Sequence, residues 1–179
     1  LAEQFDFVYA AAGVHPHEAE DVSDSYIAEI EELCRHPKVM AIGEIGLDYH
    51  YGKDFIKEQQ EVFRIQLELA SQWDLPVNIH LRDATEDMLR ILSDCRYLHL
   101  RGNLHAFGHS YEVFERVQKL GDWYVGIGGV VTFKKASIGE DIKRIPLDVQ
   151  IEDFERIKAA AERAGTKVNT FIKEAIEMR

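Results

Sequence analysis

The sequence has 179 residues, of which 46% are hydrophobic and 30% are charged, so it is long enough to fold around one sizeable core. Its formal net charge of −11 argues against a broad basic surface for nucleic acid, although a metal ion can supply the local positive charge that attracts phosphate. No apolar run approaches the roughly 18 residues that span a membrane, and no signal peptide is visible, so we expect no membrane partner.

The elements predicted from the sequence alternate along the chain. Apolar runs next to glycine or proline predict strands, and apolar residues at helical spacing predict helices. In chain order the predicted elements are a strand over 7–16, a helix over 23–36, a strand over 38–49, a helix over 54–74, a strand over 76–83, a helix over 84–95, a strand over 103–107, a helix over 110–121 and a strand over 123–131. This alternation over short connections predicts a parallel sheet covered by helices, an α/β fold.

The two cysteines, Cys34 and Cys95, lie in predicted helices and lack the spacing of metal ligands. We therefore expect both to be buried free thiols, as in a cytoplasmic protein kept in a reducing compartment. The first residue is leucine and the opening letters LAEQFDF are typical of the end of a helix, so we expect the chain to begin inside a longer protein.

The last part of the chain has a different pattern. Residues 149–179 carry apolar residues at helical spacing, with Gly165 predicted to end one helix and Thr166 to cap the next. The letters RIPLDVQI before them alternate as in a strand, so the segment from about residue 144 resembles a ribbon-helix-helix DNA-binding module of the Arc type, which would dimerise. The alternative is an ordinary helical hairpin that packs on the rest of the chain.

Histidine or glutamate stands at or near the ends of four consecutive predicted strands. These residues are His15 and His17, Glu44, His80 and His105. One histidine in an apolar strand is usually a packed core residue, but four such strands are hard to explain in that way. In a β/α barrel the catalytic groups come from the C-terminal ends of several strands. A glutamate with two or more histidines is a suitable ligand set for Zn²⁺, Mn²⁺ or a similar divalent ion.

Glu44 is the most informative of these residues. The apolar or small residues 39–43 lead directly to this lone acidic residue, as in a buried strand that delivers one polar group to the end of a sheet. Gly43 and Gly46 flank it and allow a close approach of the backbone. A carboxylate in this position is rarely structural, because burying it without a partner is costly.

Six segments resemble the TatD family of metal-dependent deoxyribonucleases, which is part of the wider group of amidohydrolase-like barrels. They are GVHPH (13–17), IGEIGLDYHY (42–51), QQEVFRIQLELA (59–70), LPVNIHLRDA (75–84), LHAF (104–107) and YVGIGGVVTFKKA (124–136). The resemblance covers residues 1–148. It implies a TIM-like (β/α) barrel that hydrolyses the phosphodiester bonds of DNA, often as an exonuclease, with two divalent metal ions.

The resemblance also implies roles for individual residues. Glu44 resembles the ligand that bridges the two metals, and His80 and His105 resemble further ligands. His15 and His17 stand in the segment near the barrel mouth, where they would orient the substrate or relay protons.

Other residues near the motifs have more than one interpretation. Arg82 would contact a phosphate, because a guanidinium group can bind phosphate with two hydrogen bonds, or it is a surface arginine paired with Asp83. We expect Asp48 and Tyr49 to support the site or the fold and not to react. The remaining histidines have no strand-end position and are expected at the surface; they are His36, His50, His99 and His109.

The chain departs from the family pattern in three places. No strand with the family's HxH pair precedes Leu1, the ETD motif with its aspartate ligand does not follow RIPLD (144–148), and the family's HCFSGS segment reads HAFGHS (105–110). We therefore expect a truncated barrel of about five strands with exposed sheet edges and three ligands. Such a fragment would bind metal weakly and be inactive alone, or be completed by another chain or a second copy.

Three functions follow from these patterns. The leading one is a metal-dependent hydrolase that cleaves DNA, with DNA as its partner. The second is a DNA-binding dimer that acts through the ribbon-helix-helix tail. The third is an amide or lactone hydrolase of the same barrel superfamily, because barrels host many chemistries, although the recognisable strands lack a carboxylated-lysine motif.

Overall fold

The computed structural model describes residues 2–23, 25–52, 54–128 and 162–163. The chain divides into two compact units, and the first, residues 1–107 and 112–127, contains the sheet. The second consists of residues 108–111 and 128–179. The predicted strand from about residue 144 and the hairpin over 149–179 lie outside the described residues, apart from the helical pair 162–163.

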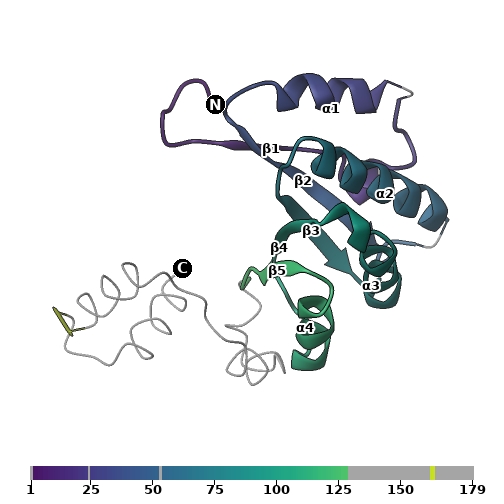
Figure 1. Cartoon of the computed structure of the whole chain (residues 1–179). Helices are drawn as coiled ribbons and strands as arrows, with labels where there is room; N and C mark the ends of the chain where they lie inside the picture. The colour runs from purple at the N-terminus through teal and green to yellow at the C-terminus, as the bar shows by residue number, and fades with distance from the viewer. Residues whose placement is uncertain (1, 24, 53, 129–161, 164–179) are drawn as a thin grey trace. The chain divides into compact units, whose positions relative to one another are not determined.

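In the described part of the chain, five parallel strands form one sheet in the order β1-β2-β3-β4-β5 (Figure 1). The strands are β1 (Ala10–Ala12), β2 (Val39–Asp48), β3 (Val77–Arg82), β4 (Arg101–Leu104) and β5 (Asp122–Val125). Each strand pairs with the next one along the chain, so the C-terminal ends of all five lie at the same edge of the sheet. This confirms the predicted parallel α/β arrangement.

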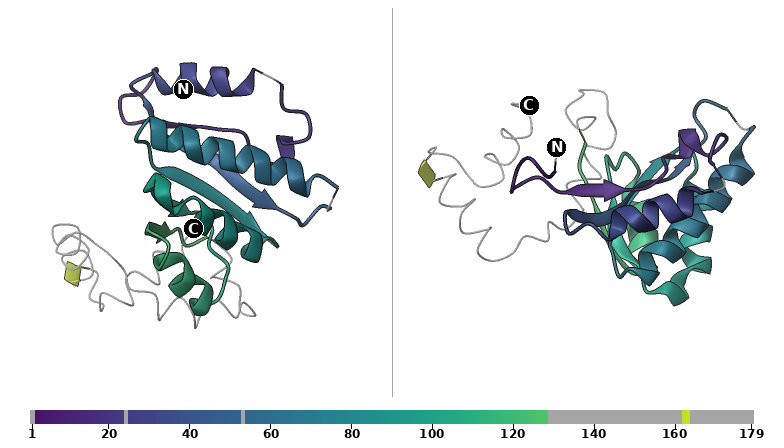
Figure 2. Two further views of the ribbon diagram at one scale, coloured as in Figure 1. Left: turned by 45° about the vertical axis from the view of Figure 1, so that its right-hand side comes forward. Right: turned by 90° about the horizontal axis from the view of Figure 1, so that it is seen from above.

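Helices in the crossover connections cover one face of this sheet (Figures 1 and 2). They are α1 (Tyr26–Cys34), α2 (Ile56–Gln72), α3 (Thr85–Asp94) and α4 (Tyr111–Gln118), with short 3₁₀ turns η1 (Pro16–Glu18) and η2 (Arg96–Leu98). Among the described residues, no helix combines the length and the apolar character that crossing a lipid bilayer requires. Cys34 and Cys95 are free and buried, as predicted.

The core lies between α2, α3 and the covered face of the sheet. Ile45 and Ile79 point from the strands, Phe63 and Leu67 from α2, and Ile91 from α3, and each is at most 1% exposed. Each such side chain contributes roughly 1.5–3 kcal/mol through the apolar surface that it removes from water. The helical periodicity of α2 therefore places its apolar positions against β2 and its neighbours.

Two glutamines are buried on the same side of α2 and bind backbone groups outside the helix. Gln66 is fully buried; its Oε1 accepts a hydrogen bond from the Val14 amide at 2.6 Å, and its Nε2 donates to the Val14 carbonyl at 3.1 Å. Gln59 binds the backbone of Asp48 in the same way, with both distances at 2.9 Å. The two glutamines thus fix the chain just before His15 and at the end of β2.

Strand β1 is shorter than the predicted strand over 7–16. The carbonyl groups before it bind the ammonium group of Lys38 instead of a neighbouring strand, with Nζ–O distances of 2.8, 2.8 and 3.3 Å to Phe5, Asp6 and Val8. After β1 the backbone turns into η1. The predicted end of the last strand, residues 129–131, lies outside the described residues.

The predicted strand over 103–107 is shifted toward the N-terminus. β4 begins at Arg101 and ends at Leu104, because its pairing with β3 stops there. The His105 amide still donates to the Ile79 carbonyl at 3.0 Å, and the Phe107 amide donates to the Gly126 carbonyl at 2.7 Å. The segment LHAF is therefore a strand end followed by a tight turn, in which Ala106 has a φ of 47°.

Replacing Gln66 with leucine tests the first of the two glutamine contacts. The Gln66→Leu variant should lose about 2 kcal/mol of unfolding free energy, because it leaves both polar groups of the Val14 backbone without their partner. Urea unfolding followed by circular dichroism measures the loss. Gln72→Leu, at the exposed end of the same helix, is the control and should change stability little. Equal stability of the two variants would contradict this role of Gln66.

A second polar contact joins the residue that follows β2 to α2 and α3. The Tyr49 hydroxyl donates to Asp87 at 2.9 Å and accepts from Gln60 Nε2 at 2.8 Å. Burial, followed by the effect of Asp87, raises the pKa of Tyr49 to about 12. The neutral phenol is therefore the form that the fold stabilises.

This pKa predicts a loss of stability at high pH. Tyrosine in the unfolded chain ionises near pH 10. The contribution of Tyr49 to the free energy of unfolding is therefore complete below that pH and is lost as the pH rises toward about 12. Tyr49→Phe should cost about 1 kcal/mol at pH 8 and progressively less above pH 10. Urea unfolding at pH 8–11 measures this difference, with Tyr97→Phe on the exposed surface as the control. A difference that does not change with pH would contradict the assignment.

Candidate metal centre

Glu44 lies at an irregularity in the pairing of β2 with β3. Gly43 is opposite Asn78 and Ile45 is opposite Ile79, so Glu44 is the extra residue between two paired positions. Such a bulge changes the direction of a side chain relative to regular alternation. The Glu44 side chain remains 34% exposed while Ile45 beside it is fully buried.

Gly46 allows β2 and β3 to approach closely next to Glu44. It has a φ of 140°, and a Cβ atom at this position would overlap the carbonyl oxygen of His80. The prediction that a flanking glycine allows close approach is confirmed here. This contact brings the end of β2 against the β3 residue that carries the next imidazole.

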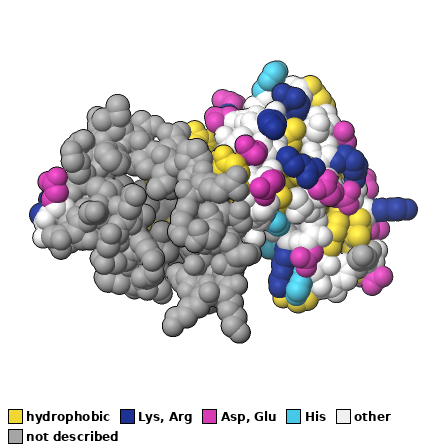
Figure 3. Space-filling view, turned by 90° about the horizontal axis from the view of Figure 1, so that it is seen from below, with side chains coloured by type: hydrophobic (Ala, Val, Ile, Leu, Met, Phe, Trp, Pro, Cys, Tyr) yellow, Lys and Arg dark blue, Asp and Glu magenta, His cyan; other side chains and the backbone are white. Residues whose placement is uncertain are grey.

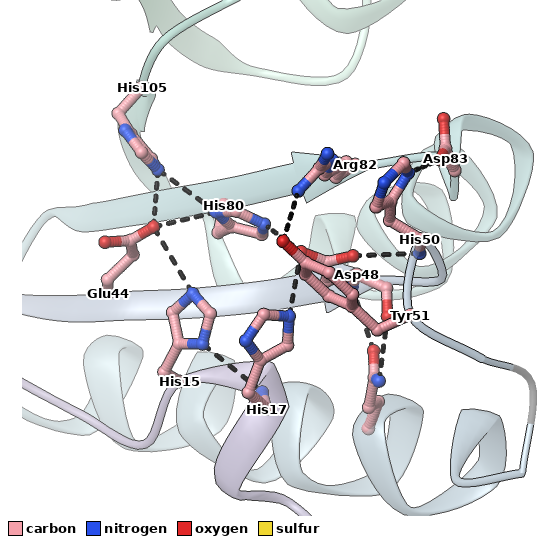
Figure 4. Close-up of polar contacts among 11 residues, drawn as sticks. His15, His17, Glu44, Asp48, His50, Tyr51, His80, Arg82, Asp83 and His105 are labelled. Carbon is pink, nitrogen blue, oxygen red and sulfur yellow. Dashed lines mark hydrogen bonds and ion pairs between the residues drawn. The ribbon is translucent and has the colours of Figure 1, made fainter.

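Three imidazole nitrogens from three neighbouring segments converge on one oxygen of Glu44 (Figure 4). Oε1 lies 2.8 Å from His80 Nδ1, 2.5 Å from His105 Nε2 and 3.6 Å from His15 Nε2. His80 comes from β3, His105 follows β4, and His15 precedes η1. Burial alone would raise the pKa of Glu44, but His105 and His80 outweigh it and hold the pKa below its usual value. The carboxylate is therefore ionised at neutral pH.

A second carboxylate, Asp48, lies on the other side of the His80 ring. Its Oδ2 is 2.9 Å from His80 Nε2 and 3.0 Å from His17 Nε2, and the side chain is 1% exposed. Burial would raise the pKa of Asp48, but the hydrogen bonds from the His50 amide and from His80 lower it. Asp48 is thus a buried anion that orients two of the site histidines.

His80 therefore lies between two carboxylates, and the position of its ring proton decides whether a metal ion fits beside it. With the ring proton on Nε2 toward Asp48, the Nδ1 lone pair points toward Glu44 and toward His105 Nε2, which is 3.3 Å away. When His105 Nε2 also carries no proton, two imidazole nitrogens and one carboxylate oxygen converge without a proton between them. A divalent cation suits this donor set, and the Asp48–His80 hydrogen bond is the kind that supports a metal-bound histidine.

His15 differs from the other two histidines in its hydrogen bonding. Its Nδ1 accepts from the His17 amide at 3.2 Å, so the neutral ring carries its proton on Nε2, toward Glu44. Burial and then the neighbouring His80 lower the pKa of His15, which favours this neutral form. The ligand atoms of His15, Glu44 and His80 nevertheless lie within 4.8 Å of one another, so His15 is next to the place where an ion would lie.

The structure thus brings together Glu44, His80, His105, His15 and His17, all predicted from the sequence. Arg82 is nearby, but its guanidinium lies over the Tyr51 ring, 5.2 Å from the centroid, and Asp83 pairs with His50 at 2.8 Å. His50 is 45% exposed, as expected of a surface histidine.

The expectation that Asp48 supports the site or the fold does not include its contacts with His17 and His80. A usable signal was present, because in a strand of period two Asp48 shares a face with position 44. Tyr51, which lies over the same end of the site, was not singled out either. Its ring contacts come from residues distant in the chain, and no local pattern predicts them.

Comparison with known proteins identifies the family. The family model described as TatD related DNase matches residues 1–164. The chain belongs to the TatD family. The matched region contains every residue of the metal centre and extends past position 148, the limit of the resemblance seen in the sequence.

Relatives and a solved structure agree with membership of the TatD family. The chain is 45% identical over 149 residues to the uncharacterized metal-dependent hydrolase YabD of Bacillus subtilis (strain 168), covering 83% of the chain and 58% of YabD. It is 36% identical over 130 residues to the 3′-5′ ssDNA/RNA exonuclease TatD of Edwardsiella piscicida, covering 72% of the chain and 50% of that protein. The structure of YJJV, a TatD homologue of Escherichia coli K12, matches with a TM-score of 0.73 and 34% identity, covering 82% of the chain and 57% of YJJV.

These comparisons confirm the predicted family, the α/β fold class of the barrel type, and membership of a group of metal-dependent hydrolases. The chain spans about half the length of the relatives that it matches. A completing chain and a dimer stay predictions, and the sequence does not distinguish Zn²⁺, Mg²⁺ and Mn²⁺. Among the described side chains visible in Figure 3, basic and acidic groups are interspersed.

Asp48→Asn tests the support that Asp48 gives to His80. Both histidines contact Oδ2, and Oδ1 accepts from the His50 amide, so an uncharged amide with one acceptor oxygen can keep only one of these two sets of contacts. The affinity for Mn²⁺ should fall about 10- to 100-fold, as measured by isothermal titration calorimetry. Asp74→Asn, in an exposed ion pair with Arg101, is the control. An unchanged Mn²⁺ affinity in a folded Asp48→Asn protein would show that Asp48 does not support the site.

Proposed function

We propose that this chain carries the catalytic half-site of a metal-dependent phosphodiesterase that cleaves DNA. The observation that supports this most directly is the convergence of His80 and His105 on Glu44 at the C-terminal ends of parallel strands. The family description as TatD related DNase supports DNA as the substrate, and the exonuclease of Edwardsiella piscicida supports single-stranded nucleic acid.

Glu44, His80 and His105 would hold the divalent ion. When bound, such an ion supplies positive charge that favours ionisation of a water molecule and offsets the negative charge on the phosphoryl oxygens. Mn²⁺, Mg²⁺ and Zn²⁺ all remain open, because a mixed carboxylate and imidazole set accepts several of them.

The protein groups around these ligands have separate tasks in this proposal. Asp48 accepts a hydrogen bond from His80 Nε2 and so keeps the ring proton on that nitrogen. The lone pair of Nδ1 is then available to bind the ion. His15, neutral and with its N–H toward Glu44 at 3.6 Å, is placed to donate a hydrogen bond to a substrate oxygen. Arg82 supplies a positive charge for a substrate phosphate at the edge of the site. His17 is oriented by Asp48 and is the candidate to transfer a proton.

An amide or lactone hydrolase of the same superfamily is the alternative within this reaction class. Both kinds of substrate present an oxygen that a cation can polarise, so the ligand set alone does not separate them. The position of Arg82 beside the site favours an anionic substrate, and a phosphodiester carries the charge that an amide or a lactone lacks.

Cleavage of labelled single-stranded DNA in Mn²⁺ or Mg²⁺ tests the proposal. The purified chain should bind a divalent ion and degrade the DNA, and a chelator should abolish both. Glu44→Gln should reduce the rate at least about 100-fold, because it removes a charged ligand. Glu86→Gln, at an exposed ion pair with Arg116, is the control and should keep the rate.

Two results would contradict this function. One is that the purified chain binds less than one divalent ion per molecule and cleaves no DNA. The other is hydrolysis of an amide or lactone substrate by the same site while DNA stays intact, which would support the alternative.

A further inference from the structure

An exposed tyrosine stands at the edge of the metal centre. Tyr51 follows β2 by three residues, and it is 74% exposed. Large aromatic side chains that stay this accessible next to a polar site are candidates for contact with a ligand. Tyr51 is not part of the ligand set or of the hydrogen bonds around Asp48.

Three neighbours hold the Tyr51 ring in place without covering it (Figure 4). The rings of His17 and His50 meet it edge to face, with centroids 5.1 and 5.0 Å away. The Arg82 guanidinium lies over one face at 5.2 Å and donates to the hydroxyl at 3.3 Å. The ring is therefore oriented before any ligand arrives, which lowers the entropy cost of stacking against it.

Tyr51 also lines a cavity of about 410 Å³, a size typical of small-ligand pockets. Phe55, which is 39% exposed, is a second aromatic wall. His17 and Asp48 line the inner side, so the cavity adjoins the metal centre directly. The cavity thus combines two aromatic side chains with a connection to the proposed reaction site.

The charges around this cavity indicate which part of a nucleotide it would take. Glu20 and Asp54 line it together with Asp48, and three carboxylates oppose a phosphate. These carboxylates suit an uncharged base, because their oxygens can accept hydrogen bonds from its N–H groups. The guanidinium of Arg82 lies over the ring of Tyr51. From there it can bind a phosphate of the nucleotide while the cavity holds the base of the same nucleotide.

We propose that this cavity binds a nucleobase of the substrate and that Tyr51 is the surface on which the base stacks. The inference rests on the proposed function, because it assigns the base to the cavity and the adjoining phosphate to the metal centre and Arg82. Stacking on an aromatic ring accepts every base, so Tyr51 would select nucleic acid over other phosphodiesters without selecting a sequence. Tyr51 is a substrate-binding residue in this proposal.

Fluorescence of 2-aminopurine tests the stacking directly, because this base is quenched when it stacks on an aromatic ring. A short single-stranded oligonucleotide that ends in 2-aminopurine is titrated with the full chain in Ca²⁺ buffer, so that binding is followed apart from cleavage. The unmodified protein and Tyr51→Phe should both quench the probe. Tyr51→Ala should abolish most of the quenching and weaken binding about 10-fold.

Tyr9 provides a matched control. It is also exposed, at 59%, and carries a cation, the ammonium group of Lys38, at 5.0 Å from its ring centroid, but it lies before β1 and does not line the cavity. Tyr9→Ala should quench and bind like the unmodified protein. A loss of quenching in Tyr9→Ala equal to that in Tyr51→Ala would overturn the proposal.

A competitor without a base separates stacking from a structural effect of the substitution. An oligonucleotide with a tetrahydrofuran residue in place of the terminal nucleoside should compete about 10-fold less well than the normal oligonucleotide for the unmodified protein. The two should compete equally for Tyr51→Ala, with circular dichroism confirming that this variant is folded. Full quenching by folded Tyr51→Ala, no quenching by the unmodified protein, or equal competition for the unmodified protein would each overturn the proposal. Because quenching does not require cleavage, quenching without DNA hydrolysis counts against the proposed function alone.

Discussion

The buried side of α2 controls the geometry of the metal centre through two amide side chains. Gln66 binds both polar groups of the Val14 backbone, and Gln59 binds both polar groups of the Asp48 backbone. An amide side chain can do this because it carries both an acceptor oxygen and N–H donors, as a backbone peptide group does. The loop that carries His15 and the end of β2 are thereby joined to one rigid helix. The histidine and carboxylate contacts depend on that common support.

The polar groups at the centre stabilise one another through charge as well as position. Glu44 and Asp48 are anions on opposite sides of the His80 ring, and the pKa of each lies below its usual value because of the groups around it. Two anions so close to half-buried imidazoles attract positive charge, either as protons on the rings or as a cation among them. A cation in this place would contact Glu44, His80 and His105 together.

Much of the fold could be predicted from the sequence, because apolar runs and helical spacing are local signals. The five strands, their helices and the strand-end positions of Glu44, His80 and His105 follow from such patterns. The shortening of β1 does not, because the Val8 carbonyl, inside the predicted strand, binds the ammonium group of Lys38, which is 30 residues later in the chain.

The metal centre was predictable as a set of residues but not as a geometry. The bulge at Glu44 and the proton position on His15 depend on contacts between strands and loops that no window of sequence contains. The same is true of Tyr51, whose surroundings come from three separate segments. Family motifs identify which side chains matter, and the packing decides which atom of each one faces the site.

The spacing of the two glutamines along α2 has a consequence for how this protein can change during evolution. Gln59 and Gln66 are seven residues apart, which is close to two helical turns, or roughly 10.5 Å along the axis. One residue inserted between them would rotate one glutamine by about 100° relative to the other and release one of the two backbone contacts. The exposed positions of this segment can therefore vary in chemistry, whereas a change in its length would break one of the two contacts. The spacing of the two glutamines along α2 therefore fixes the distance between the loop after β1 and the end of β2.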